Sequence, residues 1–211
     1  MRFDRHQPLS AHSPCPFCAP ATFTHVLTET PELMLVADNA PLVEGHLLIV
    51  PRAHYSCFGA TPASLDAELT PLLAEVSEFC ATVYRPALIF EHGIFAQSVP
   101  HAHLHIVPVG GLSAAIMGQQ GAHPVSDLND VRAYHSGIQH YVYLAQAASD
   151  GKPAGALFPP DMGTYVGVLS ALRHRSQRMN PSFAPQHIRR MGSGPMMAAV
   201  AERWAEWHDS R

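Results

Sequence analysis

Short apolar runs separated by turn-forming residues mark the first half of the chain. Two runs lie at residues 33–36 and 46–50, where Asp-Asn, Pro and Gly bound them, and a third lies at residues 88–90. Apolar runs between such residues are typical of buried strands. The pattern therefore predicts adjacent strands of one sheet.

A helical pattern fills the interval between the second and third strands. Apolar residues recur there at the spacing of one helix face: Leu65, Leu69, Leu72, Leu73, Val76, Phe79 and Val83. Thr61 and Pro62 suit the N-cap and the first position of this helix, and Pro71 is expected to kink or split it. A helix packed across one face of an antiparallel sheet predicts an α+β fold.

The second half of the chain carries weaker signals. Residues 110–130 are rich in Gly, Gln, Ser and Asn, which predicts a long loop. Apolar residues at 141–144 and 156–158 predict a hairpin around Asp150 and Gly151.

Helical spacing returns over residues 164–173 and 185–207, where two glycines and a proline interrupt the second segment. A chain of 211 residues is long enough for one domain with an extension. We expect a polar N-terminal tail at residues 1–14, a domain at residues 15–110 and a mixed C-terminal extension at residues 111–211, packed on that domain.

Composition and charge argue against several classes of protein. The formal net charge is −4 and the sequence pI is near 6.4, whereas proteins that bind nucleic-acid backbones are normally basic. The N-terminus lacks the apolar core of a signal peptide, and no apolar run reaches membrane-spanning length. A chain with only 4 cysteines does not suggest a secreted disulfide framework, so we expect a cytoplasmic protein. From the charge and the absence of long apolar runs, we expect neither nucleic-acid nor membrane partners.

The clearest chemical signal is a row of three histidines, His101, His103 and His105, with apolar residues between them. Alternate positions of a strand share one face, so the row would present three imidazoles on one side. Imidazole is a nucleophile and a metal ligand, and core packing gives no reason for such a row. Gln97 and Ser98 precede it and suit the binding of an anionic oxygen. The row predicts a functional site.

A second cluster, Cys15-Pro16-Phe17-Cys18, can direct two thiolates to one tetrahedral ion. By itself this spacing is compatible with a redox motif, with half of a zinc site or with chance.

The histidine row, preceded by Gln-Ser-Val-Pro, resembles the signature of the histidine triad (HIT) family. A block at residues 38–54 is similar to a second family pattern, with an acidic residue, Pro, Gly-His, an apolar strand, Pro and a further His. The resemblance covers roughly residues 15–110. It implies a HIT-like antiparallel sheet with a long helix packed on it, and an enzyme that hydrolyses or transfers nucleotidyl groups.

The resemblance also implies catalytic roles. His103 matches the family's nucleophile, which would attack the α-phosphorus and form a nucleotidyl-histidine. His105 would donate a hydrogen bond to a phosphate oxygen. Gln97 and Ser98 would hold phosphate or leaving-group oxygens.

Two further residues are implied in nucleotide binding. Asp38 matches the residue that binds ribose hydroxyls in relatives, and the alternative is a turn cap. His46 would lie beside the row and orient His103, or would be an ordinary core histidine.

Relatives with an N-terminal Cys pair bind zinc through both cysteines, the second His of the Gly-His block and the first His of the row. In this chain the implied zinc ligands are Cys15, Cys18, His54 and His101. A closed Cys₂His₂ site is structural and not catalytic.

We therefore expect a hydrolase that cleaves a phosphoanhydride or phosphoramidate bond in a nucleotide or nucleotide conjugate. A nucleotidyltransferase or phosphorylase with an acceptor other than water is one alternative, and a nucleotide-binding module without turnover is another. The resemblance implies a dimer joined through the sheets, and the C-terminal extension would either leave that surface free for a homodimer or cover it, so the oligomeric state stays open.

Some residues depart from the family pattern or lie outside it. Ala96 replaces the usual Gly before Gln97, which reduces how closely the backbone can approach a phosphate. His92 either joins the site or caps a strand. The one basic cluster either clamps a substrate anion or forms a solvated helix face, and the second role is the commoner one. It consists of Arg173, Arg175, Arg178, Arg189 and Arg190.

Overall fold

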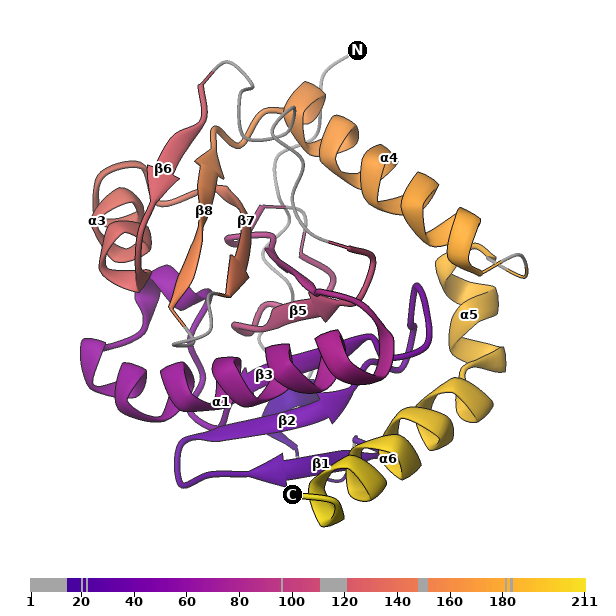
Figure 1. Ribbon diagram of the computed structural model, residues 1–211. Coiled ribbons are helices and arrows are strands. Elements are labelled where there is room, and N and C mark those ends of the chain that lie inside the picture. Colours follow the sequence, from indigo (N-terminus) through magenta and orange to yellow (C-terminus); the bar gives the residue numbers. More distant parts are fainter. Residues whose placement is uncertain are drawn as a thin grey trace.

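A computed structural model describes most of the chain, and its core is one antiparallel sheet flanked by helices (Figure 1). The described residues are 15–19, 21, 23–95, 97–110, 121–147, 152–180, 182 and 184–211. The expected polar tail at residues 1–14, Ala96 and the hairpin turn at Asp150-Gly151 lie outside them.

Eight antiparallel strands form the sheet, in the order β1-β2-β3-β5-β4-β7-β8-β6. The strands are β1 (Val26–Glu29), β2 (Leu33–Ala37), β3 (Leu47–Pro51), β4 (Leu88–Glu91), β5 (Leu104–Val107), β6 (His123–Val125), β7 (Val142–Ala147) and β8 (Pro153–Phe158). The predicted pairing of the first two apolar runs is confirmed, since Leu35 of β2 lies opposite Ile49 of β3. The sheet continues beyond residue 110, because β7 pairs with β4.

The helices are α1 (Asp66–Phe79), α3 (Leu128–Ile138), α4 (Met162–Met179), α5 (Gln186–Gly192) and α6 (Gly194–Asp209). Short turns of 3₁₀ helix lie at Pro16–Cys18, Phe58–Ala60 and Ala63–Leu65, and a π-helical turn at Cys80–Tyr84 follows α1. None of the described helices combines the length and the apolar character needed to cross a bilayer.

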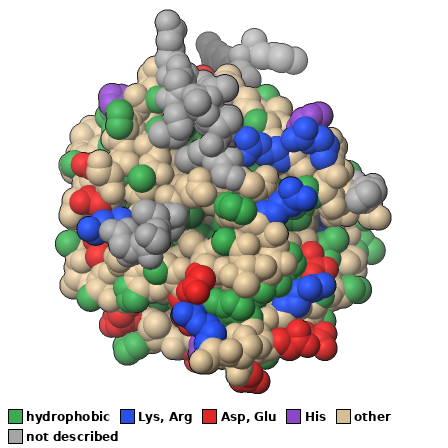
Figure 2. Space-filling view, viewed as in Figure 1, with side chains coloured by type: hydrophobic (Ala, Val, Ile, Leu, Met, Phe, Trp, Pro, Cys, Tyr) green, Lys and Arg blue, Asp and Glu red, His purple; other side chains and the backbone are tan. Residues whose placement is uncertain are grey.

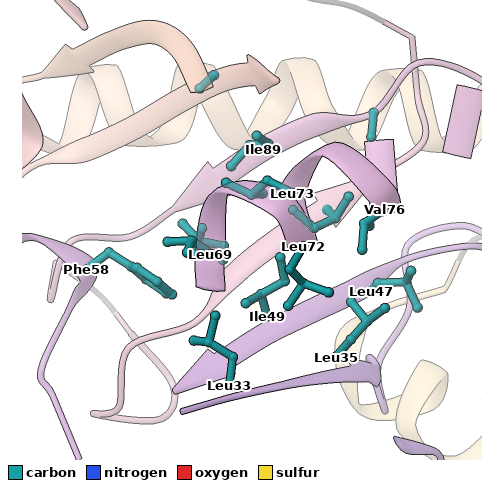
Figure 3. Packing of buried hydrophobic residues seen from close by; sticks show 14 of the residues in the cluster. Leu33, Leu35, Leu47, Ile49, Phe58, Leu69, Leu72, Leu73, Val76 and Ile89 are labelled. Atoms are coloured by element: carbon teal, nitrogen blue, oxygen red, sulfur yellow. The ribbon is translucent and has the colours of Figure 1, made fainter. Parts of the chain in front are cut away.

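The long helix α1 packs across one face of the sheet, as the sequence predicted. Figure 3 shows Leu69, Leu72, Leu73 and Val76 of α1 directed toward the apolar side chains of β2 and β3. These strand residues alternate, so Leu33 and Leu35 face the helix. Met34 and Val36 belong to a separate cluster on the opposite face. Alternation therefore gives the sheet two buried faces, one for the core and one for the site.

Two details of the predicted helix concern Pro71 and Thr61. Of the kink or split predicted at Pro71, the split is wrong, because Pro71 lies inside α1 and the packing of the apolar face of α1 on the sheet outweighs the loss of one backbone hydrogen bond. Thr61 is not the N-cap of α1, which begins at Asp66. Its hydroxyl donates to the Phe58 carbonyl oxygen at 2.7 Å.

The long loop predicted for residues 110–130 is also wrong in part, because β6 and the first residues of α3 lie in this interval. Asp127 caps α3 by accepting from the Asn129 N–H, a local signal that the polar composition concealed. The predicted hairpin is present as the β7–β8 pair. Arg132 of α3 donates to the Asp66 carboxylate and so joins α3 to α1.

The C-terminal helices follow one another along one side of the molecule, and the C-terminus lies near β1 (Figure 1). Leu169 and Leu172 of α4 pack on the sheet face opposite α1. Trp204 and Trp207 of α6 pack against Phe79 at the end of α1, with ring centroids 5.0 and 5.5 Å apart. The extension thus contacts both faces of the sheet.

Glu91, at the end of β4, is a fully buried carboxyl group. It accepts hydrogen bonds from the Phe58 N–H at 2.7 Å and from the Tyr141 hydroxyl at 2.6 Å. Burial raises the pKa of Glu91 to about 7, although both hydrogen bonds act in the opposite direction. A raised folded-state pKa stabilises the fold below the unfolded pKa, and this contribution is lost as the pH rises toward 7.

We expect Glu91→Gln to remove this pH dependence. Relative to wild type, the variant should gain on the order of 3 kcal/mol in free energy of unfolding between about pH 4.5 and about pH 7.5. Urea denaturation of both proteins across this range measures the difference. Buried histidines contribute equally to both proteins and cancel. A difference that does not change with pH would contradict the prediction.

Candidate active site

A pocket of about 350 Å³ opens on the sheet face opposite α1. The Cys-Pro-Phe-Cys turn, the 38–46 loop, the histidine row and the helices α4 and α5 all contribute to its wall. The polar and ionisable lining residues are Thr24, Asp38, Asn39, His46, His92, Ser98, His103, His105, Arg173, Gln186, Arg189 and Arg190.

Asp38, His46 and His105 form a hydrogen-bonded group on this wall. His46 Nε2 lies 3.0 Å from His105 Nδ1 and 3.3 Å from Asp38 Oδ2. The Leu42 N–H donates to His46 Nδ1 at 3.1 Å, so the ring proton of neutral His46 is on Nε2. This N–H donates to His105 Nδ1 over the shorter contact, which places the His105 proton on Nε2. His105 Nε2 is buried and has no partner among the described residues.

The same tautomers argue against a metal ion on this group, although its ligand atoms lie within 4.8 Å of one another. A metal ligand must present an unprotonated nitrogen, and His46 Nε2 carries the ring proton. Burial lowers the pKa of His46 to about 4, against the opposing charge of Asp38. Burial by itself raises the pKa of Asp38, but the interactions with His46 and with the Ala40 N–H hold it well below its usual range. A neutral imidazole beside a carboxylate is therefore the resting state.

A glycine positions His46. Gly45 has a φ of +87°, and a Cβ atom there would lie 2.9 Å from the Tyr84 ring. Only glycine adopts this conformation without strain and without a clash. The Gly-His pair in the sequence therefore marks the turn that directs His46 toward His105.

His103 lies between the two other histidines of the row and is almost fully buried. Its Nδ1–H donates to the His101 carbonyl oxygen at 2.6 Å, which leaves Nε2 with a lone pair. Burial lowers the pKa of His103 to about 3, so the ring is neutral near pH 7. The rings of His103 and His105 lie 4.9 Å apart, and both line the pocket. One wall therefore presents an unprotonated imidazole nitrogen next to an imidazole N–H donor.

His101 faces away from this pair and toward the cysteines. Its Nε2–H donates to the Pro51 carbonyl oxygen at 2.8 Å, which leaves Nδ1 unprotonated. Nδ1 lies 3.4 Å from Cys15 Sγ and 3.5 Å from Cys18 Sγ. His54 Nδ1 lies 3.2 Å from Cys18 Sγ. The four residues implied as zinc ligands are thus brought together, within 4.8 Å of one another.

The Cys-Pro-Phe-Cys turn connects this cluster to the pocket. Phe17 lies between the two cysteines, lines the pocket and packs edge-on against His103, with centroids 5.3 Å apart. Phe23 packs beside it at 5.3 Å. The role of these rings could not be predicted from the sequence, because an aromatic residue between two cysteines carries no distinct signal.

The other predicted site residues do not all line the pocket. Ser98 lines the pocket, as expected for a residue close to a bound oxyanion. Gln97 is not among the described lining residues, and its amide donates to the Ser56 carbonyl oxygen at 3.0 Å. Its role at a phosphate stays a prediction. His92 does line the pocket, beside the His105 ring at 5.8 Å.

Three members of the arginine cluster lie at the pocket, but two of them, Arg173 and Arg190, are exposed to solvent, so both interpretations of the cluster stay open. Arg173 of α4 and Arg189 and Arg190 of α5 line the pocket. The sequence could not show this, because the position of α5 depends on the packing of the whole extension.

Comparisons with known proteins found one family model and several relatives that match part of this chain. The family model described as "HIT domain" matches residues 21–110. The chain is 31% identical over 86 residues to an adenylylsulfatase of Arabidopsis thaliana, a match that covers 39% of this chain and 44% of that protein. It is 29% identical over 82 residues to an adenosine 5′-monophosphoramidase of Schizosaccharomyces pombe, covering 39% and 62% respectively. The chain thus spans about half the length of these relatives.

Solved structures similar to this one include HIT proteins. A HIT family hydrolase from Clostridium thermocellum is 22% identical, with a TM-score of 0.39 and coverage of 47% of this chain and 92% of that one. A zinc-bound histidine triad protein from Mycobacterium smegmatis is 20% identical, with a TM-score of 0.39 and coverage of 59% and 94%. The family model, with the histidine row and the Gly-His block inside its match, identifies a HIT domain at residues 21–110 of this chain.

Proposed function

We propose that the protein is a nucleotide hydrolase that cleaves a phosphoanhydride or phosphoramidate bond at the α-phosphate. In the first step, the lone pair of His103 Nε2 forms a bond to the α-phosphorus, and the leaving group departs with the electron pair of its own bond to phosphorus. In the second step, water attacks the phosphorus, the P–N bond breaks, and its electron pair returns to Nε2 while water loses a proton. The products are a nucleoside monophosphate and the leaving group. An oxyacid leaves as its anion and the proton lost by water goes to the solvent, whereas an amine takes up one proton.

One observation carries this proposal, namely the pairing of His103 with His105. His103 Nε2 has a lone pair because its Nδ1–H is held by the His101 carbonyl oxygen. His105 Nε2 is a buried donor without a partner among the described residues. A buried donor without a partner is costly, and a phosphate oxygen beside the nucleophile would satisfy it. The donor would also stabilise the charge on that oxygen during the displacement.

The remaining wall supports a nucleotide as the substrate. Phe17 and Phe23 offer apolar ring surface, which suits a base or a ribose. Asp38 Oδ1 accepts from the Ala40 N–H at 2.8 Å and keeps a second lone pair for a ribose hydroxyl. Ser98 would hold a phosphate or leaving-group oxygen.

We also propose a structural zinc ion held by the cluster of Cys15, Cys18, His54 and His101. The fit is supported by distance, because zinc bonds of about 2.3 Å to sulfur and about 2.0 Å to nitrogen place tetrahedral S and N ligands about 3.5 Å apart. The three S–N contacts in the cluster measure 3.2, 3.4 and 3.5 Å. The fit is also supported by chemistry, because Nδ1 of His101 is unprotonated. The metal would fix the Phe17 turn and the start of the histidine row.

The other expected partners and the location stay predictions. All four cysteines belong to the described residues and none is paired in a disulfide, which supports a reducing compartment such as the cytoplasm. The oligomeric state stays open between the homodimer that the family resemblance implies and a chain whose extension covers that surface.

Intact-protein mass spectrometry tests the reaction directly. The protein would be mixed with adenylyl and guanylyl dinucleoside polyphosphates and phosphoramidates, and quenched at short times. We expect a covalent adduct of one nucleoside monophosphate, absent from His103→Asn, together with released monophosphate. Binding of these compounds without adduct or product would contradict a hydrolase and favour a nucleotide-binding module. Adduct without release in water would favour a transferase.

A further inference from the structure

Three arginines from the C-terminal extension share the pocket with the histidine pair. Arg173 comes from α4, and Arg189 and Arg190 come from α5. Figure 2 shows Lys and Arg side chains gathered beside α4. Among the described lining residues, Asp38 is the one carboxylate, against these three guanidinium groups. The pocket is therefore positively charged in a chain whose formal net charge is −4.

One of these arginines has a structural role. Arg189 Nε donates to the Ala40 carbonyl oxygen at 3.3 Å, and its Nη1 donates to the Ala184 carbonyl oxygen. Asn180, in the connection between α4 and α5, donates to the Leu42 carbonyl oxygen at 3.3 Å. These bonds attach α5 to the loop that carries Asp38. Arg189 therefore holds α5, which also carries Arg190, against this loop. Its positive charge offsets the negative charge of the Asp38 carboxylate.

The other two arginines are not neutralised. Neither Arg173 nor Arg190 forms an ion pair with any carboxylate in the described part of the chain. Both are exposed at the pocket wall, where a bound anion can reach them. A guanidinium group binds the oxygens of phosphate and sulfate through paired N–H donors. Together, two guanidinium groups without a carboxylate partner can bind more negative charge than the α-phosphate of a bound nucleotide supplies.

We propose that Arg173 and Arg190 bind an anionic leaving group, so that the preferred substrate is a nucleotide joined by an anhydride bond to a phosphate or sulfate. This inference rests on the proposed hydrolase and selects between its two bond classes. When His103 attacks, the P–O bond breaks and its electron pair stays on the bridging oxygen. The leaving oxyacid departs with full negative charge, which the two arginines stabilise. An amine leaving group must instead take up a proton, and guanidinium groups do not supply one.

Leaving-group selectivity tests the proposal. With the base that forms the adduct, kcat/KM would be measured for the nucleoside diphosphate, the nucleoside 5′-phosphosulfate and the nucleoside 5′-phosphoramidate. We expect Arg173→Gln and Arg190→Gln each to lower kcat/KM by about 10- to 100-fold for the two anionic leaving groups. The phosphoramidate should change by less than about threefold. A loss on only one anionic substrate identifies whether the site is built for phosphate or for sulfate.

Arg178→Gln is the matched control, because Arg178 lies on α4 but does not line the pocket. It should leave all three activities unchanged. Equal losses on charged and neutral leaving groups, or no loss, would overturn the arginine site and leave the hydrolase intact.

A binding measurement separates this inference from the proposed reaction. Titration calorimetry would compare the affinities of wild type and Arg173→Gln for the nucleoside monophosphate and for a non-hydrolysable diphosphate. We expect the variant to lose about tenfold more affinity for the diphosphate. That result without any turnover would overturn the hydrolase and retain the arginine site, whereas equal affinity losses would overturn the arginine site.

Discussion

Replacing His103 with asparagine is expected to lower kcat/KM by roughly four to six orders of magnitude, the largest effect of any single substitution in this protein. Asparagine can still donate to the His101 carbonyl oxygen that His103 now contacts, but its amide has no basic nitrogen to attack phosphorus. Single-turnover release of nucleoside monophosphate measures the loss. Thermal melting would show that the fold is retained.

His140→Asn is the control for this substitution, because His140 is exposed and is not among the lining residues. It should keep full activity. Activity of His103→Asn within about tenfold of wild type would remove His103 as the nucleophile, because the oxyanion donors alone would then account for catalysis.

Cys18→Ser is expected to abolish stoichiometric zinc binding and to lower the melting temperature by about 5 °C or more. Cys18 Sγ contacts both His54 and His101 in the cluster, and a serine hydroxyl is a poor zinc ligand. Metal content after dialysis against a weak chelator, measured by mass spectrometry, gives the first result, and calorimetry gives the second. Wild type should retain about one zinc per chain.

Cys80→Ala separates the loss of a ligand from the loss of a thiol. Cys80 is buried at the end of α1, outside the zinc cluster, so its variant should keep the wild-type zinc content even where stability falls. A wild-type protein that retains no zinc, or a Cys18→Ser protein that retains it fully, would exclude the proposed metal site.

The sequence predicted the strands β2, β3 and β4 and the helix α1, because the patterns that specify these elements are local. Alternation of Leu33, Met34 and Leu35 specifies two faces of a strand, and the helix between the second and third strands has the spacing of one apolar face. Composition predicted the secondary structure of the C-terminal extension less well. The polar composition of residues 110–130 gave no sign of β6 or of the start of α3, because β6 has only 3 residues and α3 buries only Leu128 and Val131.

The sequence by itself determined which residue types carry the chemistry, since the histidine row and the Cys-x-x-Cys turn can be read without a structure. Only the tertiary structure showed that the three histidines of the row face different partners. His101 faces two cysteines more than 80 residues away in the chain, and His105 faces Asp38 and His46.

The position of the arginines at the pocket was also set by the tertiary structure. Contacts of Arg189 and Asn180 with the 38–46 loop hold α5 at the pocket. The physical reason is common to both cases. An imidazole or a guanidinium group takes its role from the groups within a few ångströms of it, and long-range packing chooses those groups.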